Sequence, residues 1–489
     1  MSTKRKLLVA LAVVLLVFGA FFFWVWRGTP AKHTLDELSG RDPVLVEPKA
    51  EMIPSVAIAK PVGWAAGEAP VAAKGLQVVR FAEGLEHPRV IHTLPNGDVV
   101  VAEADSPTSG GDGIMGWIAM KLMQRAGSHG ESPDKLVLLR DGDGDGTAEQ
   151  KFTLLEGKHL ASPSGLAWAD DRLYVGNHDA VIVFDYKLGE TALKGDPRKV
   201  MDLPGGGNHW MRNLVLSKDN NRLYVAVGSA SNIGEKGMEL EKGRAAIWEK
   251  DLTKDQFPRQ YAQGLRNPNG LAWNPSTDEL WVTVNERDML GPDLVPDYLT
   301  NVPVGAHYGW PWVWWKKHDD DRVKSAPPEY FDDFVRKPEY ALGAHVAALG
   351  MVFAQGGERM GPQFGNGAFI ARHGSWNRTP ASGYDVVFVK FDANGNPQGL
   401  PVPVLTGFLT GTGSTRGRPT WVTWAKDGAL LVSDDTAGII WRVIAPGAAP
   451  GAAIAPVKTA SMPPQRSLNS DPNAQYKATI GKDSTVQAH

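Results

Sequence analysis

The chain has 489 residues, a formal net charge of −3 at pH 7 and no cysteine. A charge this close to zero gives no global field that would attract nucleic acid or anionic lipid, so we expect no nucleic-acid partner. The absence of cysteine excludes disulfides, thiolate zinc sites, Cys-ligated iron–sulfur clusters and c-type haem.

The N-terminus has the pattern of a membrane anchor. Lys4, Arg5 and Lys6 precede an unbroken apolar run at residues 7–26, long enough to cross a bilayer as a helix. Because basic flanks stay cytoplasmic, we expect residues 1–27 to be a single-pass anchor in the inner membrane, with the rest of the chain in the periplasm. A cleaved signal peptide is the alternative, but the run is long for one and no clear Ala-x-Ala site follows it.

Three further segments stand apart by composition. Residues 28–75 are rich in Pro, Ala, Lys and Glu, which predicts an extended linker that lifts the next domain off the membrane. Residues 113–124 have helical apolar spacing and predict a short amphipathic helix. Residues 447–489 are Ala/Pro-rich and then polar, which predicts a disordered tail.

Between the linker and the tail, one strand–turn–strand unit recurs six times. Several copies begin with Gly-Leu-Ala-Trp or a similar stretch and return through Leu-Tyr-Val or Leu-Trp-Val after a tight polar turn. Six copies in one array predict an all-β fold, a six-bladed β-propeller over residues 76–446. An all-β sandwich is the alternative, which the recurring motif disfavours. The copies lie at residues 88–103, 163–177, 212–225, 268–282, 349–370 and 419–432.

In a propeller, the loops that precede the inner strands converge on one face of the central channel. His209 follows three glycines at residues 205–207 in such a loop and is a candidate general base; alternatively it only hydrogen-bonds its neighbours. Arginines gather in corresponding loops of other blades, which indicates a multiply anionic ligand on the axis. The candidate ligand-binding residues are Arg266, Asn267, Arg372, His373, Arg416 and Arg418. For Arg266, a salt bridge to a neighbouring blade is the alternative.

Two stretches predict cation sites. Asp141, Asp143, Asp145 and Glu149 alternate with glycines, like the first half of an EF-hand loop. The acid expected at its twelfth position is missing, so we predict a structural calcium turn, with a solvated acidic hairpin as the alternative. Asp288, at the channel mouth, is a candidate ligand for a second cation.

Tyr308 lies among the aromatic residues of the stretch 307–312, which is expected near the same mouth. Its ring has the chemistry to stack on a flat ligand, and a packed turn is the alternative.

Four motifs, taken together in their order, resemble the PQQ-dependent sorbosone dehydrogenase family, which is related to the soluble PQQ glucose and aldose sugar dehydrogenases. They are Gly-Asn-His-Trp-Met-Arg-Asn-Leu at 207–214, Gly-Leu-Arg-Asn-Pro-Asn-Gly-Leu at 264–271, His-Tyr-Gly-Trp-Pro at 307–311 and Arg-Gly-Arg-Pro at 416–419. The resemblance covers about residues 76–445. It implies a six-bladed propeller that carries pyrroloquinoline quinone (PQQ), a planar tricarboxylate, above the channel with Ca²⁺ beside it.

By motif position, the resemblance makes His209 the general base, Arg266 and Asn267 cofactor-binding residues, and Arg416 and Arg418 the pair that hold PQQ carboxylates. The chain also departs from the family pattern. The cofactor-facing lysine is absent near Arg372 and His373. Residues 286–289 read Glu-Arg-Asp-Met where the glucose enzymes hold calcium with a Gly-Pro after Glu-Gln. Asn208 stands where those enzymes carry Asp.

The resemblance implies oxidation of a sugar or sugar aldehyde by hydride transfer to PQQ, with electrons passed to a respiratory quinone or a cytochrome. Two alternatives stay open. One is a calcium-dependent sugar lactonase on a similar propeller, and the other is a non-catalytic, membrane-tethered binding propeller whose arginines hold an acidic partner.

Overall fold

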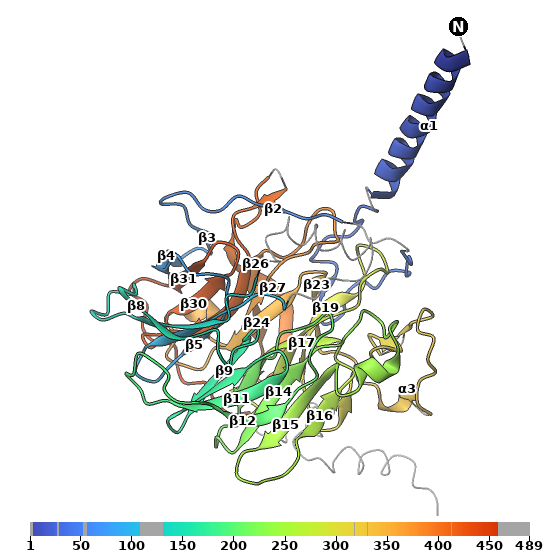
Figure 1. The fold of residues 1–489 in the computed structure, drawn as a ribbon. Coiled ribbons are helices and arrows are strands. Elements are labelled where there is room, and N and C mark those ends of the chain that lie inside the picture. Colours follow the sequence, from blue (N-terminus) through green and yellow to red (C-terminus); the bar gives the residue numbers. More distant parts are fainter. Residues whose placement is uncertain are drawn as a thin grey trace, which may run out of the picture.

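Six sheets of four or five strands surround a common axis in this computed structural model (Figure 1). Their innermost strands contact one another in the order β5, β9, β13, β17, β24, β29 and back to β5, which closes the ring. The predicted six-bladed all-β propeller is therefore confirmed. The structure describes residues 3–26, 29–51, 56–107, 131–316, 318–329, 331–411 and 413–457.

Each predicted strand–turn–strand unit forms the two inner strands of one blade. Blade 1 consists of β5 (Pro88–Thr93), β6 (Val99–Glu103), β7 (Lys135–Arg140) and β8 (Gln150–Glu156). Blade 2 consists of β9 (Gly165–Ala169), β10 (Arg172–Gly176), β11 (Ala180–Asp185) and β12 (Arg198–Asp202). Blade 3 consists of β13 (Leu214–Leu216), β14 (Arg222–Val227), β15 (Ala246–Asp251), β16 (Arg259–Gln263) and the short β20 (Ala306–His307).

The other three blades include strands from the N-terminal part of the chain. Blade 4 consists of β17 (Asn267–Trp273), β18 (Leu280–Asn285), β19 (Pro296–Asn301), β23 (Tyr340–Ala344) and β1 (Ser39–Gly40). Blade 5 consists of β24 (Ala348–Phe353), β25 (Gly367–Arg372), β26 (Asp385–Phe391), β27 (Pro397–Thr406) and β3 (Val71–Ala72). Blade 6 consists of β29 (Pro419–Trp424), β30 (Leu430–Asp434), β31 (Ile439–Ile444) and β4 (Gln77–Ala82).

The strand β4 closes the ring of blades. β4 precedes blade 1 in sequence but pairs with β31, so both ends of the propeller meet in blade 6.

The remaining elements are α1 (Thr3–Trp26), α3 (Phe331–Phe334), the 3₁₀ helices η1 (Met238–Glu241) and η2 (Pro362–Phe364), and the pairs β2 (Lys60–Pro61) with β28 (Ser414–Thr415) and β21 (Val313–Trp314) with β22 (His318–Asp319).

Contacts between neighbouring blades explain the glycine and the tryptophan at the two ends of the repeated Gly-Leu-Ala-Trp motif. A Cβ on Gly270 would clash with the carbonyl oxygen of Leu349 in the next blade, so glycine lets the inner strands approach. At the other end, the indole of Trp273 donates to the carbonyl of Leu216 in blade 3 at 2.7 Å. Trp424 makes the same kind of bond to Phe353 of blade 5 at 2.8 Å.

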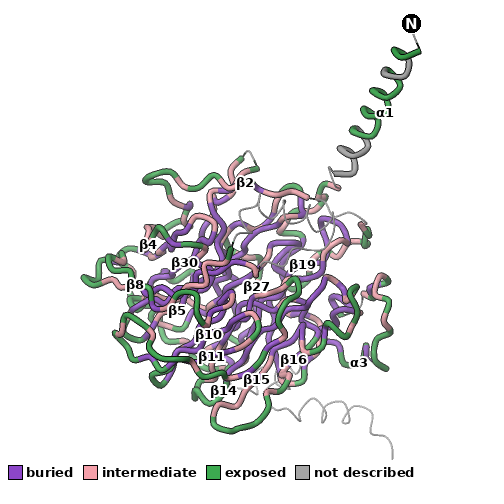
Figure 2. Tube along the Cα trace, viewed as in Figure 1, coloured by how far each residue is buried: buried purple, intermediate pink, exposed green. Residues whose placement is uncertain are grey.

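The blades bury both faces of their central strands, while the connecting loops carry most of the exposed surface (Figure 2). Every residue of β6 is buried, and its sequence, Val-Val-Val-Ala-Glu, is accordingly a continuous apolar run up to its last residue.

The segment predicted as a free linker is instead an arm on the propeller. Its described residues, 29–51 and 56–75, contribute β1 to blade 4 and β3 to blade 5, and β2 pairs with β28. Leu38 is fully buried. The prediction of an extended chain was right, but the prediction of a spacer was wrong, because the backbone groups of this segment bond to the blades rather than to water.

The apolar N-terminal run forms α1, as predicted for its conformation. In the part of the chain that the structure describes, no helix combines the length and the apolar character needed to cross a membrane. The helix predicted for residues 113–124 and most of the predicted tail, residues 458–489, lie outside the described residues.

Candidate active site

The loops that carry His209, Arg266, Asp288 and Arg418 lie at one end of the propeller, here called the mouth. An inner strand begins where the second strand of its blade ends, so each blade offers two loops to this mouth. Four inner strands also carry a bulge at this end, in β5, β17, β24 and β29. Bulges near a site redirect side chains out of the regular alternation of a strand.

His209 stands in the loop before β13 with its ring held by one carbonyl. Its Nδ1 lies 2.9 Å from the carbonyl oxygen of Ser229 and 3.0 Å from Ser229 Oγ. A carbonyl only accepts, so Nδ1 carries the proton and Nε2 keeps its lone pair. Burial, together with the nearby Arg266, lowers the pKa of His209 to about 3. The ring is therefore neutral, with one nitrogen able to take a proton.

A glycine directly after the neighbouring strand β14 makes room for this histidine. A Cβ on Gly228 would stand 2.5 Å from the Cβ of His209 and would clash with Oδ1 of Asn267. His209 and Asn267 therefore lie together over the backbone of Gly228. The fully buried Arg212 fixes the loop from below, donating to the carbonyls of His209 at 2.9 Å and Pro204 at 2.7 Å.

The buried Arg266 and the partly exposed Asp288 form an ion pair beside His209. Nη2 of Arg266 lies 2.9 Å from Oδ2 of Asp288, and Nη1 donates to the carbonyl of Glu286 at 2.6 Å. Asn377, after β25, donates to Oδ1 of Asp288 at 2.9 Å. His345 also faces this carboxylate, with Nδ1 at 3.5 Å. The Arg266 charge, together with His345 and the nearby His209, holds the pKa of Asp288 well below its usual range, although burial alone would raise it.

A second charged group gathers at the loops of blades 5, 6 and 1. Arg418 donates from Nε to the carbonyl of His373 at 3.0 Å, and its guanidinium lies over the ring of Tyr384 at 5.3 Å. Nε2 of His373 lies 2.9 Å from Oδ2 of Asp435. Asp435 also forms an ion pair with Arg89. Asp435 lines a cavity of about 570 Å³ at this side of the mouth.

Arg89 and Asp435 were missed in the sequence. Asp435 follows the second strand of blade 6 as Asp288 follows that of blade 4, and Arg89 stands at the start of the inner strand of blade 1. Their place in loops at the same end of the blades as His209 and Arg266 was the signal that would have identified them.

Three predicted ligand-binding residues face away from the mouth: Arg372, Tyr308 and Arg416. Arg372 donates to Asp385 on the adjacent strand at 2.7 Å and to the carbonyl of Leu342 at 3.0 Å, so its guanidinium is used within the blades. Tyr308 is buried, and its hydroxyl donates to the carbonyl of Asn301. The packed-turn alternative for Tyr308 is the one observed.

Arg416 points to the N-terminal arm, with Nε 3.4 Å from Glu68 and its guanidinium 5.7 Å from the ring centroid of Trp64. The prediction that Arg416 and Arg418 project to the same face was therefore wrong. It assumed an extended strand, whereas these residues fall between β28 and β29, where the alternation does not apply.

The predicted calcium turn brings its four carboxylates together. One oxygen from each of Asp141, Asp143, Asp145 and Glu149 lies within 4.8 Å of the others. Oxygen donors at this spacing, on a turn rich in glycine, suit a hard cation.

The donor set at Asp288 fits a cation less well. Its carboxylate already pairs with Arg266, and its carbonyl accepts from Nδ2 of Asn232 at 3.1 Å. The carbonyl of Met289 accepts from the backbone of Glu51 and from Arg322, each at 3.1 Å. The two carbonyls at the position where the glucose enzymes hold calcium are therefore both engaged within the protein.

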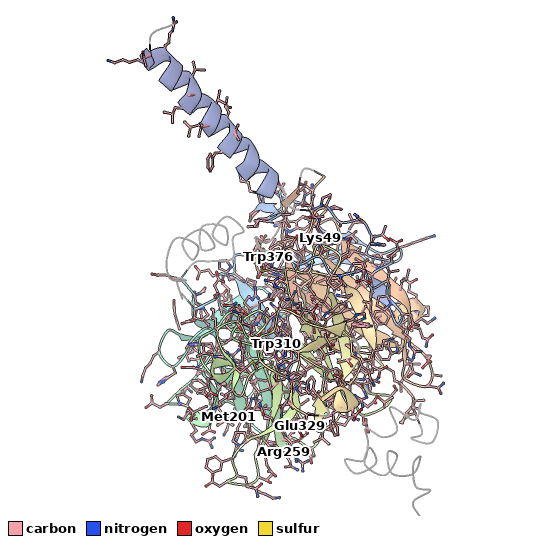
Figure 3. The ribbon with its side chains drawn as sticks, turned by 90° about the vertical axis from the view of Figure 1, so that its right-hand side faces the viewer. Lys49, Met201, Arg259, Trp310, Glu329 and Trp376 are labelled. Atoms are coloured by element: carbon pink, nitrogen blue, oxygen red, sulfur yellow. The ribbon has the colours of Figure 1, made fainter. Side chains whose placement is uncertain are left out.

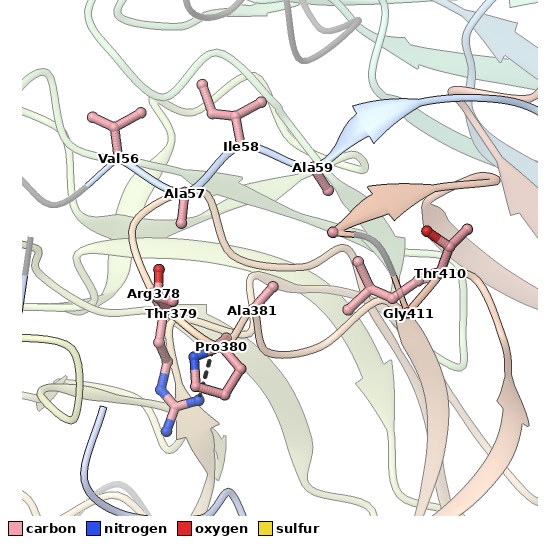
Figure 4. Close-up of a pocket in the computed structure, with 12 residues that line it drawn as sticks. Val56, Ala57, Ile58, Ala59, Arg378, Thr379, Pro380, Ala381, Thr410 and Gly411 are labelled. Atoms are coloured by element: carbon pink, nitrogen blue, oxygen red, sulfur yellow. Dashed lines mark hydrogen bonds between the residues drawn. The ribbon is translucent and has the colours of Figure 1, made fainter. Parts of the chain in front are cut away.

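The arm also frames a cavity of about 560 Å³ next to the mouth loops (Figure 4). Arm residues 56–59 form one wall, and residues 378–381 and 409–413, apart from 412, form the rest. The lining is mostly aliphatic, and the guanidinium of Arg378 is bonded to the carbonyls of Pro292, Pro380 and His33.

Comparison with known proteins agrees with the fold. The structure of a carbohydrate-active enzyme of family AA12 from Trichoderma reesei has a TM-score of 0.62 and 22% identity, and covers 77% of this chain and 97% of that one. The holo PQQ domain of pyranose dehydrogenase from Coprinopsis cinerea has a TM-score of 0.60 and 21% identity, over 79% of this chain and 100% of that domain.

In sequence, the chain is 26% identical over 292 residues to the PQQ-dependent pyranose dehydrogenase of Coprinopsis cinerea. The match covers 48% of this chain and 39% of that protein, so the chain spans well under half of that relative's length. A family model described as TrAA12-like matches residues 132–301 and 324–445, more than half of the chain. The chain therefore belongs to the TrAA12-like family.

Proposed function

We propose that this protein is a PQQ-dependent dehydrogenase that oxidises a sugar or sugar aldehyde. The observation that carries the proposal is the state of His209, a neutral imidazole whose Nδ1 donates to Ser229 and whose Nε2 is left to accept a proton at the channel mouth. Its place in a TrAA12-like propeller, and the PQQ-dependent relative, support the same activity.

The charges at the mouth fit a flat polyanion such as PQQ. Arg266, Arg418 and Arg89 come from blades 4, 6 and 1. Within the described residues, the buried Nε of Arg89 has no hydrogen-bond acceptor, and an anionic ligand would satisfy it. Arg418, Arg89 and His373 would hold carboxylates on one side, with Arg266 and Asn267 on the side of the base. PQQ, when bound, supplies the electrophilic carbon that accepts the hydride.

The protein itself moves the proton. Nε2 of His209 takes the proton from the C1 hydroxyl of the sugar, or from an aldehyde hydrate, while the C1 hydrogen leaves with its electron pair and C1–O becomes a carbonyl. The resulting imidazolium is stabilised by the Ser229 carbonyl at Nδ1 and by the Asp288 carboxylate, whose charge favours protonated His209. A low pKa in the resting site keeps the base unprotonated before the substrate arrives.

The remaining parts of the proposal rest on the sequence. We propose Ca²⁺ at the turn of residues 141–149, a respiratory quinone or a cytochrome as electron acceptor, and anchoring in the inner membrane through residues 7–26 with the propeller in the periplasm. Fractionation of cells, followed by protease accessibility of the propeller in spheroplasts, tests the last point.

The decisive test reconstitutes the purified protein with PQQ and Ca²⁺ and measures reduction of an acceptor dye with a panel of sugars. We expect turnover in the wild type and a loss of about 10²- to 10⁴-fold in kcat for His209→Gln, the range for removal of a general base. PQQ binding, followed by absorbance, should stay within a few-fold. Absence of PQQ binding contradicts the proposal, and lactone hydrolysis without any acceptor would identify the lactonase instead.

A further inference from the structure

The N-terminal arm is bonded to the loops that build the mouth. The backbone N–H groups of Lys49 and Glu51 donate to the carbonyls of Leu290 and Met289, each at 3.1 Å. Further along the arm, the N–H of Ala57 donates to the carbonyl of Trp376 at 2.7 Å. Figure 3 shows Lys49 and Trp376 at the same end of the molecule, opposite Met201 and Arg259.

These contacts fall next to two residues of the candidate site. Met289 directly follows Asp288, and Trp376 directly precedes Asn377. Asp288 and Asn377 hydrogen-bond each other at 2.9 Å. The arm therefore holds the loop after β18 and the loop after β25 from outside, at the positions where they meet inside the mouth.

Arg322 joins the arm to the first of these loops. Its Nη1 donates to the carbonyl of Glu51 at 3.2 Å and to the carbonyl of Met289 at 3.1 Å. One guanidinium thus reinforces the backbone bond between the same two residues. Arg322 itself has no contact with His209, Arg266 or Asp288 among the interactions of the described residues.

Only one partner of the ion pair that the arm supports, Asp288, is accessible to a ligand in the mouth. The side chain of Asp288 is 21% exposed, whereas that of its partner Arg266 is 5% exposed. Both oxygens of Asp288 already accept one hydrogen bond, and a carboxylate has capacity for more. A hydroxyl group of a ligand in the mouth would meet this carboxylate next to His209.

We propose that Asp288 binds a hydroxyl group of the substrate, and that the arm, through Arg322, positions Asp288 for this contact. The proposal deepens the function proposed above and rests on it for the identity of the substrate as a polyhydroxylated sugar. The family model matches residues 132–301 and 324–445, so the arm and Arg322 lie outside the matched part. The arm is thus a feature of this chain that its membership in the family does not explain.

The test compares Arg322→Ala, Arg322→Lys and Asp288→Asn in the full chain. Hydrogen exchange of the PQQ-free protein follows the amides of Lys49 and Glu51, and steady-state kinetics follows KM and kcat with the best sugar. Lys337→Ala is the matched control, because Lys337 also donates to an arm carbonyl, that of Arg41 at 3.3 Å, but away from the Asp288 loop.

For Arg322→Ala we expect exchange at Glu51 to accelerate by about fivefold or more, and KM to rise by about five- to tenfold with kcat within twofold. Arg322→Lys, which can still reach the two carbonyls, should restore both values, and Lys337→Ala should change neither KM nor kcat. Asp288→Asn should raise KM at least as much. The double variant with Arg322→Ala should add little, because both changes act on one contact.

Unchanged exchange in Arg322→Ala, an unchanged KM, or additive effects in the double variant would each overturn the proposal. A uniform loss of thermal stability with normal KM would do so too, since it would assign the arm to folding alone. If the wild type turns over no sugar, the proposed function fails, and the exchange rates of the PQQ-free protein then decide the positioning role by themselves.

Discussion

At the scale of single residues, the pKa of His209 depends on burial and on two opposing charges beside it. Burial is the largest cause of its low pKa, Arg266 is the next, and the Asp288 carboxylate acts in the opposite direction. The ion pair between Arg266 and Asp288 therefore adjusts the proton affinity of the candidate base, which burial lowers most, without touching its reactive nitrogen.

This arrangement predicts the effect of Arg266→Gln. With the positive charge gone and Asp288 still ionised, the pKa of His209 should rise from about 3 by at least about one unit, equivalent to about 1.4 kcal/mol. An NMR titration of the His209 ring in the PQQ-free protein measures it directly. Arg259→Gln, an exposed arginine of blade 3, is the control and should leave the titration in place.

The same shift has a consequence for acid stability. The folded-state pKa of His209 is about 3, below the ordinary value of 6.5, so the unfolded chain binds a proton that the folded protein does not between these pH values. The contribution of His209 is complete above pH 6.5 and is lost as the pH falls through this window. In Arg266→Gln the pH range over which this stability is lost should narrow. An identical pH dependence of the free energy of unfolding in both proteins would contradict this account.

At the scale of elements, the sequence predicted the features that depend on local chemistry. Tight turns, and in some blades the Gly-Leu-Ala-Trp motif, identified most of the inner hairpins, because glycine at the axis and tryptophan at the strand end each have a fixed packing role. His209 was found in the same way, on a glycine-rich loop before an inner strand.

Features that depend on contacts between distant segments could not be predicted from the sequence pattern. The arm looked like a linker because it is rich in Pro, Ala, Lys and Glu, while its bonding partners, such as Leu290 for Lys49, lie more than two hundred residues away. The Arg89–Asp435–His373 group needs three blades to meet. Arg416 was misassigned because residues 416–418 lie outside any strand, and Tyr308 because an aromatic motif does not reveal whether its ring is buried.

Trp273 links two blades by a hydrogen bond, so its replacement should lower the stability of the propeller. Trp273→Phe removes the indole N–H and leaves the carbonyl of Leu216 without its 2.7 Å donor, so we expect a loss of about 1–3 kcal/mol in the free energy of unfolding. Chemical denaturation measures it. Trp376→Phe, where the described residues offer the indole no hydrogen-bond acceptor, should cost less than half as much; equal losses would assign the effect to ring size alone.

At the scale of the whole molecule, the acidic turn lies where the ring closes. The turn of residues 141–149 connects β7 and β8 of blade 1. Its Ala148 donates from the backbone N–H to the carbonyl of Phe81 in β4 at 2.8 Å, and β4 completes blade 6. A Cβ on Gly146 would stand 2.8 Å from the guanidinium of Arg442 in β31. The turn therefore contacts both of the strands that close the propeller.

A cation bound at this turn should stabilise the whole propeller. Four carboxylates within 4.8 Å repel one another, and Ca²⁺ would remove this repulsion in the folded state only. At about one hundred times the dissociation constant, binding adds about 2.7 kcal/mol, which corresponds to several degrees in the melting temperature. We expect EDTA to lower the melting temperature of the PQQ-free protein and Ca²⁺ to restore it. Asp143→Asn should make the protein insensitive to both, while Asp171→Asn, in the exposed β9–β10 turn, should leave the response intact. A melting temperature that ignores Ca²⁺ and EDTA in the wild type would show that the turn closes the ring through its hydrogen bonds alone.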